Sequence, residues 1–166
     1  MITQYAVHSI KGVKIIIVNR QKIKDYLKEL DGRNLEDLNL ACEMMMFCFG
    51  DISIHSQCFT RIIRKEQILL TTSDYQNWDG ENEKHNDMWY NLACHIDAII
   101  NKKVIETQLT DTNDLFIWLE NDVCIQMFIS HSHPHYGNDR EQWRIFRQGN
   151  VDVPHTVVYS QTVQDE

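Results

Sequence analysis

Three histidines stand two residues apart near the C-terminal end of the chain, at His131, His133 and His135. In an extended segment alternate side chains point the same way, so the three imidazoles would share one face. Two histidines at that spacing can bind zinc or a similar ion, and His135 or Asp139 is the candidate third ligand. A small metal-dependent hydrolase that uses His131, His133 and His135 is therefore one hypothesis.

Other features of this stretch argue against a metal centre. Pro134 interrupts strand hydrogen bonding, and Tyr136–Asp139 is rich in turn-forming residues. The histidines also lack the following acid of the metallo-β-lactamase pattern H-x-H-x-D-H, and the chain is too short for that fold. We therefore expect an exposed histidine-rich loop between two strands, with no metal and no cofactor.

No other arrangement of residues predicts catalysis. Cys94 and His95 are adjacent on a predicted helix, so their side chains diverge by about 100° and cannot form a nucleophile–base pair. His55 lies on the polar face of a predicted strand near Arg61, which favours a structural hydrogen-bonding role. The motifs of serine hydrolases, P-loops, dinucleotide-binding folds and zinc proteases are missing, and six glycines are too few for a phosphate-binding loop. We predict that the chain is not an enzyme.

Segment Ser73–Asp87 is the best functional feature by physical criteria. It holds five carboxylates against Lys84, with Tyr75 and Trp78 among them. Aromatic side chains are enriched at the energetic centres of interfaces, and carboxylates pair with cations of a basic partner. The predicted partner-binding residues are Asp74, Tyr75, Trp78, Asp79, Glu81 and Glu83. The alternative is a solvated loop whose Trp78 packs back onto the core.

Charge and composition narrow the class of partner. The chain has 166 residues with 16 Lys plus Arg and 24 Asp plus Glu, a net charge of −8. Such a chain repels phosphate backbones, so nucleic acid is not an expected ligand, and a basic protein is favoured. In the simplest alternative, the net negative charge only keeps the protein soluble.

The length fits a single domain over residues 1–166, and no segment is apolar enough to span a membrane. The N-terminus lacks signal-peptide features, so we expect a cytoplasmic protein.

The five cysteines form neither a disulfide framework nor a zinc ribbon. Their number is odd, their spacings are wide, and no C-x-x-C occurs. Each lies among apolar neighbours, which predicts buried, reduced thiols in a reducing compartment. The cysteines are Cys42, Cys48, Cys58, Cys94 and Cys124.

The N-terminal half predicts short strands and one helix. Strands are expected at Gln4–Ile10 and Val13–Val18, and Asn19 can cap a helix with Ile23, Leu27 and Leu30 on one face and Gly32 at its end. Leu35–Cys42 is ambiguous between helix and strand. Four further strands and their turns are then predicted. They are Met44–Phe49 (alternatively the end of a helix from Leu35), Asp51–Phe59 after a turn at Gly50–Asp51, and Thr60–Arg64 with Gln67–Thr72 around Lys65–Glu66.

The C-terminal half predicts one longer helix and more hairpins. Asn86 or Asp87 caps this helix, and Lys102–Lys103 lie at its C-terminus, where the helix dipole favours cations. Its apolar face is Trp89, Leu92, Ala93, Ile96 and Ile99 or Ile100. The expected strands are Lys103–Leu109, Leu115–Leu119, Val123–Ile129, Gln142–Arg147 and His155–Gln161. The fold class is therefore α+β, a mostly antiparallel sheet of hairpins with one or two packed helices.

Several segments, which together cover roughly residues 40–160, resemble one family of small bacterial proteins of unassigned biochemistry. Ile54–Ile62 resembles its pattern H-x-Q-C-x-x-R-I, and Thr72–Asp74 resembles its S-S-D continuation. Asp114–Phe128 is similar to the final hairpin of the family, Glu141–Phe146 to its E-x-W-R-x-F ending, and His155–Val158 to its closing strand.

The family is in turn similar to immunity proteins encoded beside polymorphic or contact-dependent toxins. The resemblance implies that the chain binds and neutralises a cognate basic toxin domain, such as a nuclease, without catalysis. It supplies no catalytic residue, and the histidine-rich segment departs from the family's acidic or serine-rich one, so no metal role follows. The matching residues His55, Arg61, Asp74, Trp143 and Arg144 are predicted to form a hydrogen-bonded structural seam. The remaining hypothesis is a scaffold or regulatory binding domain with an unknown ligand.

Overall fold

A computed structural model describes residues 20–149 and 152–166 of the chain. The strands predicted at Gln4–Ile10 and Val13–Val18, and the cap predicted at Asn19, lie outside these described residues. Within them the chain forms two α-helices and eleven strands in two antiparallel sheets, which confirms the predicted α+β class. Neither of the described helices is both long and apolar enough to cross a membrane.

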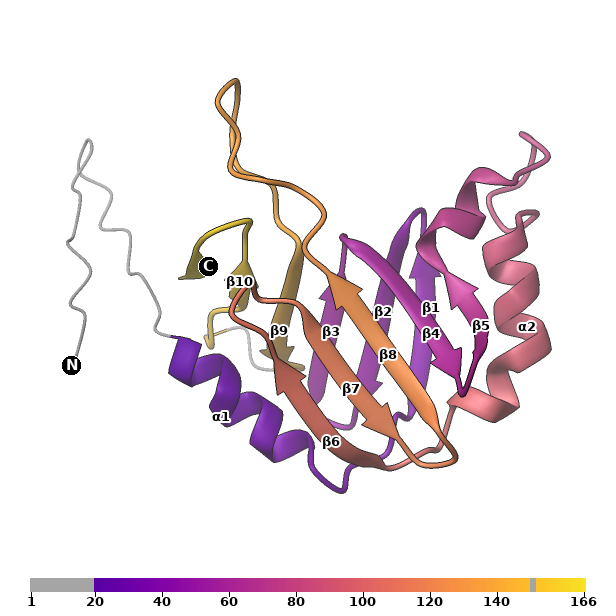
Figure 1. Cartoon of the computed structure of the whole chain (residues 1–166), viewed down its shortest axis with the longest axis horizontal. Helices are drawn as coiled ribbons and strands as arrows, with labels where there is room; N and C mark the ends of the chain where they lie inside the picture. Colours follow the sequence, from indigo (N-terminus) through magenta and orange to yellow (C-terminus); the bar gives the residue numbers. More distant parts are fainter. Residues whose placement is uncertain (1–19, 150–151) are drawn as a thin grey trace.

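The two sheets lie one behind the other (Figure 1). The six-stranded sheet has the order β1-β2-β3-β9-β10-β11, with β1 Asp37–Ala41, β2 Met44–Phe49, β3 Ile52–Ser56, β9 Trp143–Arg147, β10 Thr156–Val158 and β11 Val163–Asp165. The five-stranded sheet has the order β5-β4-β8-β7-β6, with β4 Phe59–Arg64, β5 Gln67–Thr71, β6 Val104–Leu109, β7 Leu115–Leu119 and β8 Val123–Phe128. Helix α1 (Arg20–Leu30) lies beside β6, and α2 (Asp87–Ile99) lies beside β5.

Within the described residues, the hairpins predicted around Gly50–Asp51 and Lys65–Glu66 are confirmed, and so are their turns. Gly50 takes a φ of 74° between β2 and β3, and Lys65 takes a φ of 55° between β4 and β5. The ambiguous segment Leu35–Cys42 contains a strand, because Asp37–Ala41 pairs antiparallel with Met44–Phe49. A helix running from Leu35 into Phe49 is therefore wrong.

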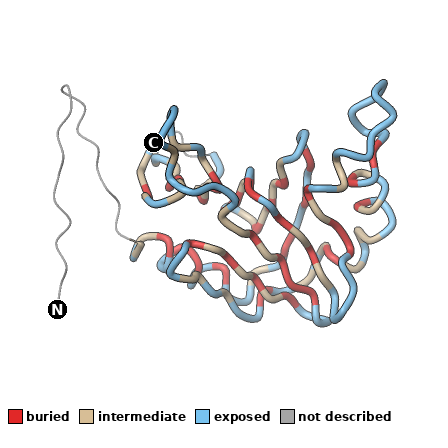
Figure 2. Tube along the Cα trace, turned by 45° about the horizontal axis from the view of Figure 1, so that its top comes forward, coloured by how far each residue is buried: buried red, intermediate tan, exposed pale blue. Residues whose placement is uncertain are grey.

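The core lies between the sheets because alternate side chains of each strand point inward. In β2, Met45, Phe47 and Phe49 are buried while the residues between them are half-buried. Figure 2 shows this alternation along the strands. The chain passes between the sheets twice, and the two passages are joined where the backbone N–H groups of Gln57 and Cys58 donate to the Gln142 carbonyl, at 2.8 and 2.9 Å.

Helix α1 follows the predicted pattern, with Tyr26 as an additional buried residue. Gly32 ends it with a φ of 78°, as predicted for a left-handed residue after a helix. Helix α2 is capped by Asn86, and it buries Leu92 and Ile99 and packs Trp89, Ile96 and Ile100 against the core, as predicted. Met88 is buried in addition, and Ala93 is exposed rather than buried. The helix ends at Ile99, so the interaction predicted between Lys102–Lys103 and its last turn is wrong.

The predicted closing strand His155–Gln161 is shorter than expected and turns back on itself. A hydrogen bond from Tyr159 N to Thr162 O joins β10 to a strand that the sequence did not predict, β11. The Asp165 carboxylate on β11 binds the Lys22 ammonium of α1 at 2.6 Å. This C-terminal hairpin therefore connects the edge of the six-stranded sheet to α1.

Candidate partner-binding site

The acidic segment begins in a short 3₁₀-helix, η1 (Thr72–Gln76), that directly continues β5. Thr71 caps η1, because its hydroxyl accepts from Ser73 N while its own N–H donates to the Asp74 carboxylate. The Asn91 amide of α2 also donates to Asp74, at 2.9 Å. Asp74 is thus half-buried and holds η1 against α2.

Residues 77–86 form a loop, called the acidic loop below, that is closed by its own hydrogen bonds. Asp79 N donates to His85 O and Asp87 N to Asn77 O, which draws the two ends together. The Asp79 carboxylate accepts from the N–H groups of Glu81 and Asn82 and contacts the His85 imidazole at 2.9 Å. The hydrogen bond from Glu81 N is the largest cause that lowers the pKa of Asp79, so this carboxylate is charged at neutral pH.

Tyr75 and Trp78 stack on each other at the base of this loop. Their ring centroids are 6.0 Å apart with an interplanar angle of 26°. Trp78 is 44% exposed and donates its indole N–H to Asn82 O, so it does not pack back onto the core. A hydrogen bond with Cys42 is the largest cause that raises the pKa of Tyr75, followed by desolvation, and the charges of Glu83 and Glu43 contribute least. Tyr75 is half-buried and packs against the core, so the pair presents mainly the Trp78 ring to solvent.

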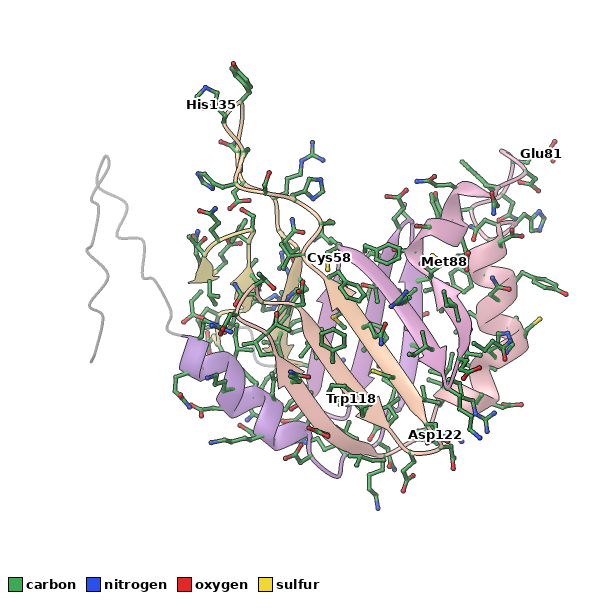
Figure 3. The ribbon with its side chains drawn as sticks, viewed as in Figure 1. Cys58, Glu81, Met88, Trp118, Asp122 and His135 are labelled. Atoms are coloured by element: carbon green, nitrogen blue, oxygen red, sulfur yellow. The ribbon has the colours of Figure 1, made fainter. Side chains whose placement is uncertain are left out.

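The other predicted contact residues point into solvent. Glu81 and Glu83 are exposed and form no ion pair within the described residues, and Figure 3 shows Glu81 at the outer tip of the loop. A shallow pocket of about 480 Å³ lies between the loop and α2, lined by Asn77, Lys84, His85, Asp87, Trp89 and Tyr90. Of the six predicted residues, Trp78, Glu81 and Glu83 are the most available to a partner, Tyr75 supports them, and Asp74 and Asp79 shape the loop.

The histidine-rich loop lies elsewhere, between β8 and β9, and its three imidazoles do not converge. The His131 Nδ1 atom contacts Ser130 Oγ at 3.1 Å, His133 approaches Asp139 at 3.7 Å, and His135 packs edge-on against Tyr136. Figure 3 shows His135 at the projecting end of the loop. Among the described residues, no group of three or more histidine, cysteine or carboxylate side chains is arranged to hold a metal ion.

Burial differs among the cysteines, all of which are free thiols. Cys58 and Cys124 are buried, and desolvation raises the pKa of Cys124 to about 11. Cys42 and Cys94 are exposed, so the prediction that every thiol is buried is wrong. Cys42 lies in the turn between β1 and β2, and Cys94 lies on the outward side of α2, where apolar neighbours in sequence do not imply burial.

The residues predicted to form one structural seam lie in four separate places, so that prediction is wrong. Arg61 lies on the five-stranded sheet, where its Nε donates to Gln126 Oε1. Trp143 is buried in the core, and Asp74 caps η1. Only His55 and Arg144 meet, as cross-strand neighbours on β3 and β9.

A compact polar cluster surrounds this last pair on the outer face of the six-stranded sheet. Phe146 lies between two imidazoles, edge-on to His55 at 4.9 Å and stacked on His155 at 4.0 Å. Arg144 forms a bidentate ion pair with Glu141 and donates through Nη1 to His155 Nδ1 at 3.1 Å. Sequence reasoning missed His155, because only the pairing of β9 with β10 brings it to Arg144.

This cluster predicts that acid destabilises the fold. Desolvation and the Arg144 charge lower the pKa of both His55 and His155 below 6.5. As the pH falls from 6.5 towards these lowered values, the unfolded chain binds protons that the folded chain does not, so the free energy of unfolding decreases. Urea unfolding at pH 7.5 and pH 5 should show a lower midpoint at pH 5.

A double variant separates this effect from other titrations. In H55Q/H155Q neither side chain titrates, and the amide introduced by His155→Gln keeps an acceptor oxygen for Arg144. The difference between the two midpoints should be smaller in this variant than in the natural chain. An equal difference in both chains would place the pH sensitivity elsewhere.

No protein family, curated protein or solved structure compared with this chain matches it.

Proposed function

We propose that this chain is an immunity protein of the bacterial cytoplasm, which binds a cognate basic toxin domain, such as a nuclease, and blocks it without catalysing a reaction. The observation that carries the proposal is the exposed Trp78 ring, stacked on the half-buried Tyr75 in a loop with the exposed carboxylates of Asp79, Glu81 and Glu83. The resemblance of several segments to a family of small bacterial proteins that is similar to immunity proteins supports the same function.

The physical properties of the loop suit tight binding to a cationic surface. Stacked aromatic rings offer a large contact area and lose little conformational entropy on binding. The hydrogen bonds that close the loop before binding reduce the cost of ordering it. Glu81 and Glu83 form no ion pair with any residue that the structure describes, so their carboxylates attract Lys and Arg side chains of a partner and accelerate encounter. A nuclease binds phosphates with such cations, so an acidic loop can occupy its active site.

Co-expression with the product of the gene immediately upstream tests this function. We expect that product to arrest growth when expressed alone, and this chain to restore growth and to co-purify with it as a stable complex. Continued arrest with both proteins present and no complex would contradict the proposal. Turnover of a substrate by the purified chain alone would contradict the non-catalytic role.

A further inference from the structure

The outer face of the five-stranded sheet carries a second group of aromatic side chains, apart from the acidic loop; Phe59 is exposed, and Phe116, Trp118 and Phe128 are half-buried. We name it the aromatic face, and its outward side chains are Phe59, Arg61, Ile63, Ile68, Glu106, Gln108, Phe116, Trp118, Gln126 and Phe128. It faces the viewer in Figure 1, where neither helix crosses it, and Figure 3 shows Trp118 on it far from Glu81. Ile68 is 52% exposed and Phe59 38% exposed, although both are large and apolar.

The side chains of the aromatic face form one continuous layer. Phe116 stacks on Trp118 at 5.8 Å and meets Phe128 edge-on at 5.6 Å. Phe59 lies 6.0 Å from Phe128, and the Arg61 guanidinium lies 5.3 Å from the Phe128 ring centroid. Contiguous apolar surface of this kind on a soluble protein usually marks an interaction site.

The charge of this face differs from that of the acidic loop. Its centre carries the cation of Arg61 on β4, held by Gln126 on the adjacent strand, rather than a carboxylate. A basic partner attracted to Glu81 and Glu83 therefore does not match it. The complement of an arginine beside aliphatic side chains is an aromatic surface, since guanidinium groups bind the faces of aromatic rings.

The strand order supplies that complement within the same chain. Strands β4 and β7 flank β8, and the registers align Arg61 with Gln126 and Phe116 in one row and Ile63 with Cys124 and Trp118 in the next. A two-fold axis along β8 would place Arg61 of one copy over Phe116 of the other, and Ile63 over Trp118. The same axis places Ile68 on β5 over Glu106 on β6, because these residues extend the second row on either side.

We propose that the aromatic face binds a second copy of this chain, and that the two copies are related by this two-fold axis. Five strands about 4.8 Å apart, with three outward rows about 6.7 Å apart, present about 480 Å² per copy before side-chain relief is added. Two such faces bury about 1,000 Å², which is about the smallest area of a biological interface and is typical of weak, transient ones. We therefore expect a weak dimer, with a dissociation constant in the micromolar range. It does not depend on the toxin-binding function.

Sedimentation velocity of the purified full chain from about 5 to 300 μM tests the proposal. We expect the mass to rise with concentration from 19.7 kDa towards twice that value. W118E should weaken the dimer at least tenfold, whereas the matched change W78E, in the acidic loop, should leave it intact. A chain that stays monomeric at 300 μM overturns the proposal, and so does a folded W118E chain that dimerises like the natural one.

Two substitutions at Ile68 test the axis itself and avoid the packed part of the face. I68E places a carboxylate opposite Glu106 of the other copy, so it should weaken the dimer, whereas I68K should preserve or strengthen it. Equal dissociation constants for the two variants would overturn the proposed arrangement. Toxin binding by the same variants is measured in a separate assay. If W78E loses toxin binding and W118E keeps it, the two surfaces are independent.

Discussion

Replacing both Glu81 and Glu83 with lysine should weaken binding to the cognate toxin domain by about 100-fold, or about 2.8 kcal/mol. Both carboxylates are exposed and lack ion pairs within the described residues, so the loop keeps its shape when they change. The reversal removes two attractions and adds two repulsions beside the Tyr75–Trp78 stack. Titration calorimetry at 0.15 M salt, with the toxin domain in the syringe, measures the change.

A matched double reversal isolates the position from the charge. E66K/D97K changes the net charge by the same amount, but Glu66 lies in the β4–β5 turn and Asp97 near the end of α2, away from the loop (Figure 1). The control should retain affinity within about threefold, since distant exposed charges are screened by salt. Equal losses in the two variants would show that net charge, rather than this loop, determines binding.

Replacing Trp143 with alanine should lower the free energy of unfolding by about 4 kcal/mol, because it opens a cavity in the core and removes a buried hydrogen bond. Trp143 is fully buried on β9, and its Nε1 donates to Asn113 O at 3.0 Å, in the turn between β6 and β7. It therefore packs in the six-stranded sheet and bonds to the five-stranded one. Urea denaturation followed by far-UV circular dichroism measures the loss.

Two comparisons separate packing from the hydrogen bond. W143F keeps most of the buried volume and loses the indole N–H, so it should cost about half as much as W143A. W118A removes the same side chain from the partly exposed aromatic face and should cost clearly less. A W143A chain that is as stable as W118A would contradict the position of Trp143 in the core.

The sequence predicted local structure well where turns and periodicity agree. The β4–β5 and β7–β8 hairpins appear where alternating apolar residues flank short polar turns, and Asn86 caps α2 as its side chain predicts. The predicted inward face of α2 is confirmed except at one position, because Leu92 and Ile99 are buried and Trp89, Ile96 and Ile100 pack against the core. Ala93 is exposed and Met88 is buried instead, which only the contact of α2 with β5 decides.

Long-range pairing could not be predicted in the same way. The sequence indicates strands, but it does not show that β9 inserts between β3 and β10. That insertion creates the cluster of His55, Arg144 and His155, from residues separated by as many as 100 positions. Strand pairing over such distances depends on the whole core rather than on any local signal.

For the candidate site, the composition of the segment predicted where a partner binds. It did not show which acidic residues face the partner and which stabilise the loop. The acidic and aromatic character of residues 74–87 indicated a binding loop, and Trp78 and Glu81 are exposed on it. Asp74 and Asp79 looked equivalent to Glu81 in sequence. Short aspartate side chains bond readily to nearby backbone N–H groups, which is why these two stabilise the turn instead.

Hydrogen–deuterium exchange of the chain, with and without the toxin domain, tests most directly whether the acidic loop is where a toxin binds. We predict that the toxin protects the amides of η1 and of residues 77–86. The histidine-rich loop between β8 and β9 should exchange at the same rate in both samples. Unchanged exchange at residues 77–86 in a saturated complex, with protection confined to other segments, would contradict the proposed site.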